Sequence, residues 1–209
     1  YNTYTFGKRH VSSAIDEGWD VKKDHQFKPE DDDNYVSWIE RNGLAKEFAW
    51  DWAAEFGRGP KGSSYFDTII PTADLGTRIS KLPEKYTMEA YTTRETIKMI
   101  QEQAKSDKPF LCWATFYRPH QPYNPLQKYM DMYNVSEWGE GTKKGGGIKM
   151  PASFYEPAEN LPPLLQSQRN GGNKVWNMDK AFENEQLWRD YIGAYFALVT
   201  EIDYCVGEI

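Results

Sequence analysis

Two basic side chains follow the first strand-like run of the sequence. Lys8 and His10 stand two residues apart, directly after the run from Asn2 to Phe6. Because residues two apart in an extended chain point the same way, Lys8 and His10 can face one site while Arg9 faces away. A lysine supplies a fixed positive charge for a sulfate or phosphate oxygen, and a histidine can transfer a proton near neutral pH. The pair therefore suits an anionic substrate, although a Lys-x-His pair also arises by chance on protein surfaces.

A third basic residue, His120, stands in a proline-rich loop after an apolar run. The run from Pro109 to Tyr117 is nearly all apolar, and the loop from Arg118 to Pro125 carries further prolines. Prolines fix φ and remove hydrogen-bond donors, so the strand must end before them. Open α/β sheets bind ligands outside the carboxyl ends of their strands. His120 could therefore join Lys8 and His10 in one site, or it could be an ordinary hydrogen-bonded loop residue.

The elements that would position these residues form a helix–strand unit. Thr87 can cap a helix that runs from Met88 to about Lys105, with its smaller and apolar side chains along one face. The apolar run after this helix is typical of a central strand of a parallel sheet, covered on both faces. The sequence therefore predicts an α/β fold, with a mainly parallel central sheet flanked by helices.

Three other segments complete the expected organisation. The stretch from Tyr35 to Asn42 predicts a short helix, and the stretch from Phe48 to Thr77, rich in Trp, Phe, Gly and Pro, predicts an irregular packed loop. Apolar residues spaced by three and four predict a long helix that still continues at Ile209. Because the chain opens inside a strand-like run and closes inside a helix, we expect residues 1–209 to be part of one domain, truncated at both ends.

Composition and charge exclude several classes of partner. The formal net charge is -6, and neither a basic face nor a Lys/Arg run is visible, which argues against nucleic acid or an anionic membrane surface. No apolar run approaches the ~18 residues of a membrane span. The two cysteines, Cys112 and Cys205, have no metal-type spacing and are expected to be buried free thiols.

Four short motifs, in order along the chain, resemble the formylglycine-dependent sulfatases of the alkaline-phosphatase-like superfamily. Gly7-Lys8-Arg9-His10 resembles the Gly-Lys-Trp-His signature of that family, and the segment from Phe116 to Tyr123 resembles its Pro-His-x-Pro loop. Leu82-Pro83-Glu84 fits the approach to the helix at Met88. The segment from Tyr195 to Asp203 resembles the long helix that precedes the family's Asp-His-Gly strand.

The resemblance implies roles for the basic residues. Lys8 would neutralise a sulfate oxygen, and His10 would hydrogen-bond the hydrated aldehyde of formylglycine and assist sulfate release. His120 would bind the sulfate and help to protonate the leaving alcohol, and Arg118 beside it would reach the substrate. Fixed cations and a proton donor lower the barrier because the transferred group is anionic and charge develops on the leaving oxygen. The family also uses one Ca²⁺, held by Asp and Asn oxygens.

The chain departs from the family pattern in ways that limit what it can do alone. The Cys-x-Pro-Ser-Arg motif that yields formylglycine is absent, and Arg9 replaces the usual Trp. The family's calcium ligands would lie before Tyr1 and after Ile209, so we assign no metal ligand within this chain. We expect the 209-residue polypeptide by itself neither to hydrolyse sulfate esters nor to bind calcium tightly.

Three functions remain open at this point. The resemblance implies a sulfuric ester hydrolase that acts on a small-molecule or carbohydrate sulfate, in the periplasm or outside the cell. A hydrolase of phosphonate esters or phosphodiesters with the same fold is the first alternative. A non-catalytic sulfatase-like binding protein that has lost the nucleophile is the second.

Overall fold

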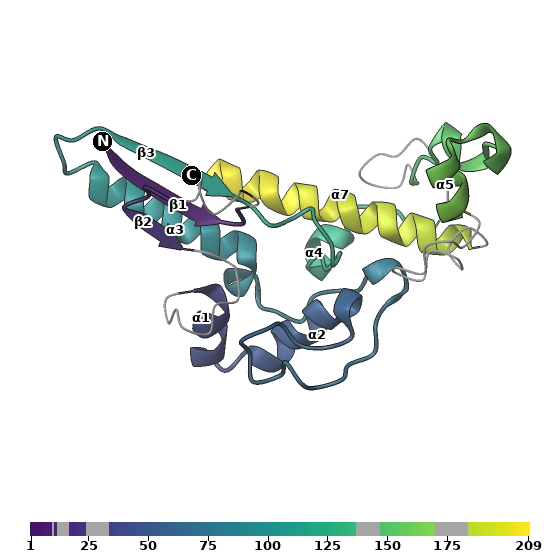
Figure 1. Cartoon of the computed structure of the whole chain (residues 1–209), viewed down its shortest axis with the longest axis horizontal. Coiled ribbons are helices and arrows are strands. Elements are labelled where there is room, and N and C mark those ends of the chain that lie inside the picture. Colours follow the sequence, from purple (N-terminus) through teal and green to yellow (C-terminus); the bar gives the residue numbers. More distant parts are fainter. Residues whose placement is uncertain (10, 12–16, 24–33, 137–146, 170–183) are drawn as a thin grey trace.

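The computed structural model describes residues 1–9, 11, 17–23, 34–136, 147–169 and 184–209. His10 therefore lies outside the described residues. Three parallel strands form a sheet in the order β2-β1-β3 (Figure 1). They are β1 (Asn2–Gly7), β2 (Val21–Lys23) and β3 (Phe110–Thr115). The parallel arrangement brings the carboxyl ends of β1 and β3 to the same edge of the sheet.

A close backbone contact joins those two strand ends. Gly7 has φ +95°, and a Cβ at this position would lie 1.8 Å from the carbonyl oxygen of Thr115, so only glycine fits. The Thr115 hydroxyl lies 2.6 Å from the carbonyl oxygen of Lys8 and 3.1 Å from that of Phe6, and it can donate to either. The backbone of Lys8 is thereby fixed beside the end of β3.

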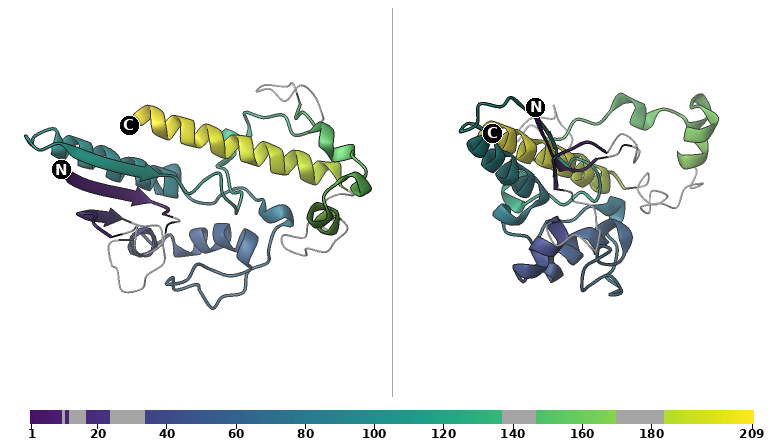
Figure 2. Two further views of the ribbon diagram at one scale, coloured as in Figure 1. Left: turned by 45° about the horizontal axis from the view of Figure 1, so that its top comes forward. Right: turned by 60° about the vertical axis from the view of Figure 1, so that its left-hand side comes forward.

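Two long helices support the sheet. α3 (Met88–Gln103) begins where the Thr87 hydroxyl accepts from the Ala90 N–H, as predicted, and it packs against β1 and β3. α7 (Glu185–Glu208) lies against α3. Both views of Figure 2 place the start of β1 and the end of α7 at the same end of the molecule, so α7 runs opposite to β1.

The stretch predicted to be an irregular loop is partly helical, which corrects that expectation. α1 (Tyr35–Arg41) is followed by α2 (Ala45–Phe56), which ends at Gly57 in the left-handed conformation. α2 is rich in alanine and glutamate, which favour helix, and the Gly- and Pro-rich segment after it obscured this signal. A core cluster joins α1 and α2 to the start of α3; its buried residues are Tyr35, Val36, Ile39, Phe48, Leu82, Met88 and Tyr91.

Short elements make up the remaining connections. Among them are the short α-helices α4 (Gln127–Met130), which packs against α7, and α5 (Pro163–Ser167). Within the described residues the single turns of 3-10 helix are η1 (Asp74–Gly76), η2 (Glu84–Tyr86), η3 (Ala152–Tyr155) and η4 (Ala158–Asn160). None of the described helices is long and apolar enough to cross a membrane.

The apolar strand β3 is parallel, as predicted, but it is not central. Within the described residues β3 lies at the edge of the sheet, and β1 is the central strand. Leu111 is 54% exposed and Trp113 38%, so β3 is not covered on both faces. A continuous apolar run indicates a strand suited to burial, but whether both faces are covered depends on which segments pack against it. Cys112 on this strand and Cys205 on α7 are free thiols, and Cys205 is the more buried.

Candidate active site

Lys8 and His120 both lie against the ring of Tyr117. Lys8 follows β1 directly, and its Nζ is 4.5 Å from the centroid of the Tyr117 ring. The His120 ring lies in the loop after β3, with its centroid 5.1 Å from that of Tyr117. The two strand ends therefore bring together two of the three residues predicted to be catalytic. The third, His10, lies outside the described residues.

Tyr117 was not among the predicted site residues. The only signal in the sequence was its position, as the last aromatic residue of the apolar run before the loop. Burial raises the pKa of the Tyr117 phenol to about 12, so the ring stays neutral at neutral pH. A neutral ring beside Lys8 offers the ammonium its negatively polarised face without competing for an anionic ligand.

Burial also acts on Lys8. It lowers the pKa of the Lys8 ammonium from its usual value, and the nearby Glu55 carboxylate on α2 partly opposes this shift. Partial burial weakens the competition of water for the ammonium. An anion bound next to Lys8 would therefore interact with it more strongly than with a fully solvated lysine.

His120 is exposed, and its loop defines the hydrogen bonding of one ring nitrogen. Its Nδ1 lies 2.7 Å from the carbonyl oxygen of Gln121. A carbonyl only accepts, so Nδ1 carries a hydrogen, and Nε2 is the ring atom that can take up and release a proton. The loop contains two cis peptide bonds, Arg118–Pro119 and Gln121–Pro122.

Arg118 faces inward beneath this loop. Its side chain is only 7% exposed. The Arg118 backbone N–H donates to Glu89 Oε1 at 3.1 Å, and Nη1 donates to the His120 carbonyl at 3.4 Å. Arg118 thus connects the His120 loop to α3 and leaves little surface for a ligand. Direct contact between Arg118 and substrate stays a prediction, and the position favours a supporting role.

Three buried carboxyl groups surround Arg118. They come from different helices: Asp51 from α2, Glu89 from α3 and Glu201 from α7. Burial raises the pKa of Asp51 to about 7 and that of Glu201 to about 8, and it also raises the pKa of Glu89. The positive charge of Arg118 opposes each of these shifts. One guanidinium therefore compensates several carboxyl groups under the proposed site.

These raised pKa values predict that the protein loses stability as the pH rises. In the folded state Asp51 keeps its proton up to about pH 7, whereas in the unfolded state it releases the proton near its ordinary pKa of 3.8. The free energy of unfolding should therefore be highest below about pH 4 for this group and fall toward pH 7, by at most about 1.4 kcal/mol per pH unit. Glu201 extends the window to about pH 8.

Urea denaturation of the whole protein at several pH values, with Asp51→Asn as the comparison, measures this effect. Asn keeps an acceptor oxygen for the Lys81 N–H, and its amide NH2 can donate to the Ser80 hydroxyl in place of the bond that Ser80 donates to Asp51. We expect the loss of stability between pH 5 and pH 8 to be smaller in Asp51→Asn than in the wild type. Equal losses in the two proteins would show that Asp51 does not carry the effect.

The described residues do not provide a metal centre. No group of three or more His, Cys, Asp or Glu side chains in the described ranges could hold a metal ion. The three buried carboxyl groups around Arg118 are included in that finding. We therefore assign no calcium ligand to these residues.

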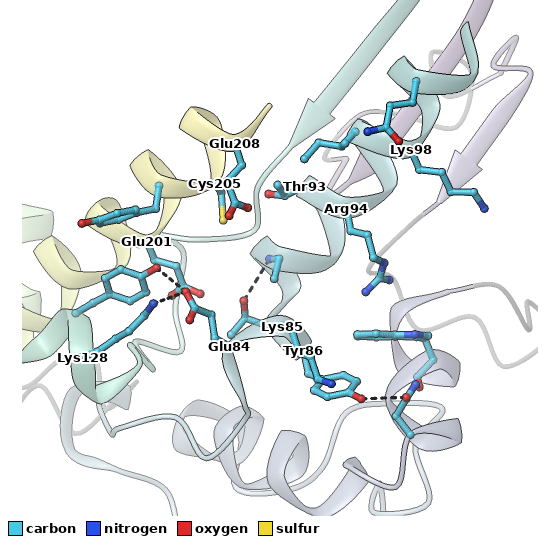
Figure 3. A pocket seen from close by; sticks show the side chains of 18 residues that line it. Glu84, Lys85, Tyr86, Thr93, Arg94, Lys98, Lys128, Glu201, Cys205 and Glu208 are labelled. Carbon is cyan, nitrogen blue, oxygen red and sulfur yellow. Dashed lines mark hydrogen bonds and ion pairs between the residues drawn. The ribbon is translucent and has the colours of Figure 1, made fainter. Parts of the chain in front are cut away.

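A large groove lies elsewhere, on the helical side of the molecule (Figure 3). It has a volume of about 1040 Å³ between α3 and α7, and none of Lys8, Arg118 and His120 lines it. Two of its basic residues are engaged locally: Lys128 pairs with Glu84, and the Arg94 guanidinium lies 4.3 Å from the centroid of the Trp38 ring. We place the candidate site at the strand ends because the residues able to handle an anion meet there.

Solved structures that resemble this chain include two hydrolases, and no family model matches it. A phosphonate monoester hydrolase of Agrobacterium radiobacter is 18% identical, with a TM-score of 0.59, and one from Silicibacter pomeroyi is 15% identical, with a TM-score of 0.54. Each match covers 99% of this chain and 40% of the other. The chain has their alkaline-phosphatase-like α/β fold, which confirms the predicted fold class, and it spans less than half of their length.

Proposed function

We propose that this chain belongs to a catalytic domain that hydrolyses sulfate esters, to which it contributes the sulfate-binding and proton-transfer residues. The observation that carries the proposal is the meeting of Lys8 and His120 at the ring of Tyr117. The strands β1 and β3 are far apart in sequence but pair in the sheet, so the Lys8 ammonium and the His120 imidazole lie at one place. The sulfatase-like motifs around the same residues support sulfate as the group transferred.

Each residue has a defined task in the proposed reaction. The Lys8 ammonium neutralises an oxygen of the bound sulfate, and the His120 imidazolium gives a proton to the departing alcohol oxygen. As the resemblance implies, His10 would hydrogen-bond the hydrated aldehyde of formylglycine and assist the release of sulfate. Formylglycine would supply the attacking oxygen, and Ca²⁺ would polarise the sulfate; we propose that both are held by residues outside this chain.

The two cysteines of this chain are poor sources of the nucleophile. Burial raises the pKa of the Cys205 thiol to about 11 and also raises that of Cys112. Cys205 lies on α7 and lines the groove between α3 and α7, together with Glu201. The missing nucleophile motif and these thiols support the same conclusion, that the nucleophile is contributed from elsewhere.

Hydrolysis of phosphonate monoesters is the second candidate function. The two solved structures described above, which share the fold over 99% of this chain, are phosphonate monoester hydrolases. A phosphonate monoester, like a sulfate ester, presents anionic oxygens to Lys8 and a leaving alcohol to His120. The residues described here serve either ester, and the difference must be measured.

Steady-state kinetics on two substrates with the same leaving group separates the candidates. The protein to use is the whole protein, that is, the complete catalytic domain to which we propose that this chain belongs. We expect kcat/KM for 4-nitrophenyl sulfate to exceed that for 4-nitrophenyl phenylphosphonate by at least about tenfold. Because the leaving alcohol is identical, the ratio reports on the transferred group. A preference for the phosphonate would overturn the sulfatase proposal, and turnover of neither ester would favour a non-catalytic binding protein.

A further inference from the structure

We propose that Trp52 and Phe56 form a leaving-group subsite, which selects esters whose alcohol carries a ring with an apolar face. The subsite adjoins Tyr117 and so extends the proposed active site along α2. This inference rests on the proposed function for the anionic end of the substrate. It adds the class of alcohol that the anion is attached to.

The geometry of α2 creates a short stack of rings. Trp52 and Phe56 are four residues apart on the helix, so they lie on one face of it. Their ring centroids are 4.8 Å apart with an interplanar angle of 25°, which is a stacked arrangement. Phe56, at the end of the helix, is 43% exposed. The stack therefore runs from a partly buried indole to a phenyl ring at the surface.

This stack is continuous with the candidate active site. The centroid of the Trp52 ring lies 6.0 Å from that of the Tyr117 ring. Tyr117 is in turn the ring that both Lys8 and His120 contact. Glu55, next to Phe56, lies near enough to Lys8 to influence its pKa. An ester with its anion at Lys8 would thus have aromatic surface within reach of its alcohol. Aromatic faces of this kind stack on aryl rings and on the apolar faces of sugar rings.

Core packing explains part of this arrangement but not all of it. Trp52 also packs against Phe48, at a centroid distance of 6.0 Å, so it helps to hold α2 in the core. Phe56 lies beyond that core and exposes nearly half of its surface. Removing the Phe56 ring should therefore change the stack without unpacking α2, which makes Phe56 the residue to vary.

Binding of non-hydrolysable sulfonates to the whole protein tests the subsite separately from catalysis. Titration calorimetry would compare 2-naphthalenesulfonate, which has a flat ring, with methanesulfonate, which has none. We expect Phe56→Ala to weaken binding of naphthalenesulfonate by about three- to tenfold and that of methanesulfonate by less than about twofold. Phe56→Trp should restore the loss. Lys8→Ala is the matched control, because it should weaken both sulfonates.

Each outcome bears on the proposal. Unchanged naphthalenesulfonate binding in Phe56→Ala, or binding of neither sulfonate to the wild type, overturns the subsite. Selective loss in a protein that hydrolyses no ester supports the subsite and overturns the proposed function alone. Kinetics or binding with glucose 6-sulfate then separates the two kinds of ring that have an apolar face: a parallel loss in Phe56→Ala indicates a sugar, and no loss indicates an aryl alcohol.

Discussion

Lys8→Ala is expected to lower kcat/KM of the whole protein for its anionic ester by about 10²- to 10³-fold. Lys8 is the cation that the structure fixes at the end of β1, through the contacts of its backbone with Thr115 and of its Nζ with the Tyr117 ring. A positive charge held in place before the reaction stabilises the developing anionic charge without reorganisation. Steady-state kinetics on 4-nitrophenyl sulfate and 4-nitrophenyl phenylphosphonate measures the effect.

Lys81→Ala is the matched control for this prediction. Lys81 also places its ammonium over an aromatic ring, at 3.5 Å from the centroid of Trp50, but it lies before α3 and not at a strand end. Its loss should change kcat/KM by less than about twofold. Equal effects of Lys8→Ala and Lys81→Ala would mean that Lys8 has no role in the reaction beyond that of an ordinary surface lysine.

Arg118→Ala is expected to destabilise the folded protein strongly, by roughly 3–5 kcal/mol in the free energy of unfolding. The substitution removes the positive charge that lies among Asp51, Glu89 and Glu201, all of which are nearly fully buried. Without that charge, an ionised carboxylate has no compensating cation, and the pKa values of Asp51 and Glu201, already about 7 and about 8, rise further. Urea denaturation at pH 7 measures the change.

Arg94→Ala on α3 is the comparison for Arg118→Ala. The Arg94 side chain is 42% exposed and pairs with Glu95, so its loss should cost less than about 1 kcal/mol. A similar small loss in Arg118→Ala would show that the three carboxyl groups do not depend on the guanidinium. In that case Arg118 would become available again for the predicted contact with substrate.

Several local features of this fold follow directly from the sequence. The Thr87 cap, the helix after it and the parallel strand β3 are set by capping chemistry and by periodicity, which act over a few residues. The long helix α7 follows from apolar residues at spacings of three and four. The position of Lys8 at the end of β1 was predictable in the same way, because a strand and the residue after it are local features.

Prediction was weaker where one local signal competed with another. The helix α2 was missed because the Trp and Phe residues inside it and the Gly- and Pro-rich segment after it suggested irregular structure, although its Ala and Glu residues favour helix. The burial of β3 was overestimated. An apolar run shows that a strand is suited to burial, but it does not show which segments pack against it. The second error concerns packing partners that a sequence window does not contain.

The amino-acid sequence by itself determined the helix–strand order, the parallel sheet and the strand-end positions of Lys8 and His120. Only the tertiary structure decided that these two residues meet on the ring of Tyr117 and that Arg118 turns inward to three carboxyl groups from three helices. The physical reason is range. Helix caps and periodicity are properties of neighbouring residues, whereas burial and the compensation of charge arise only when distant segments pack together.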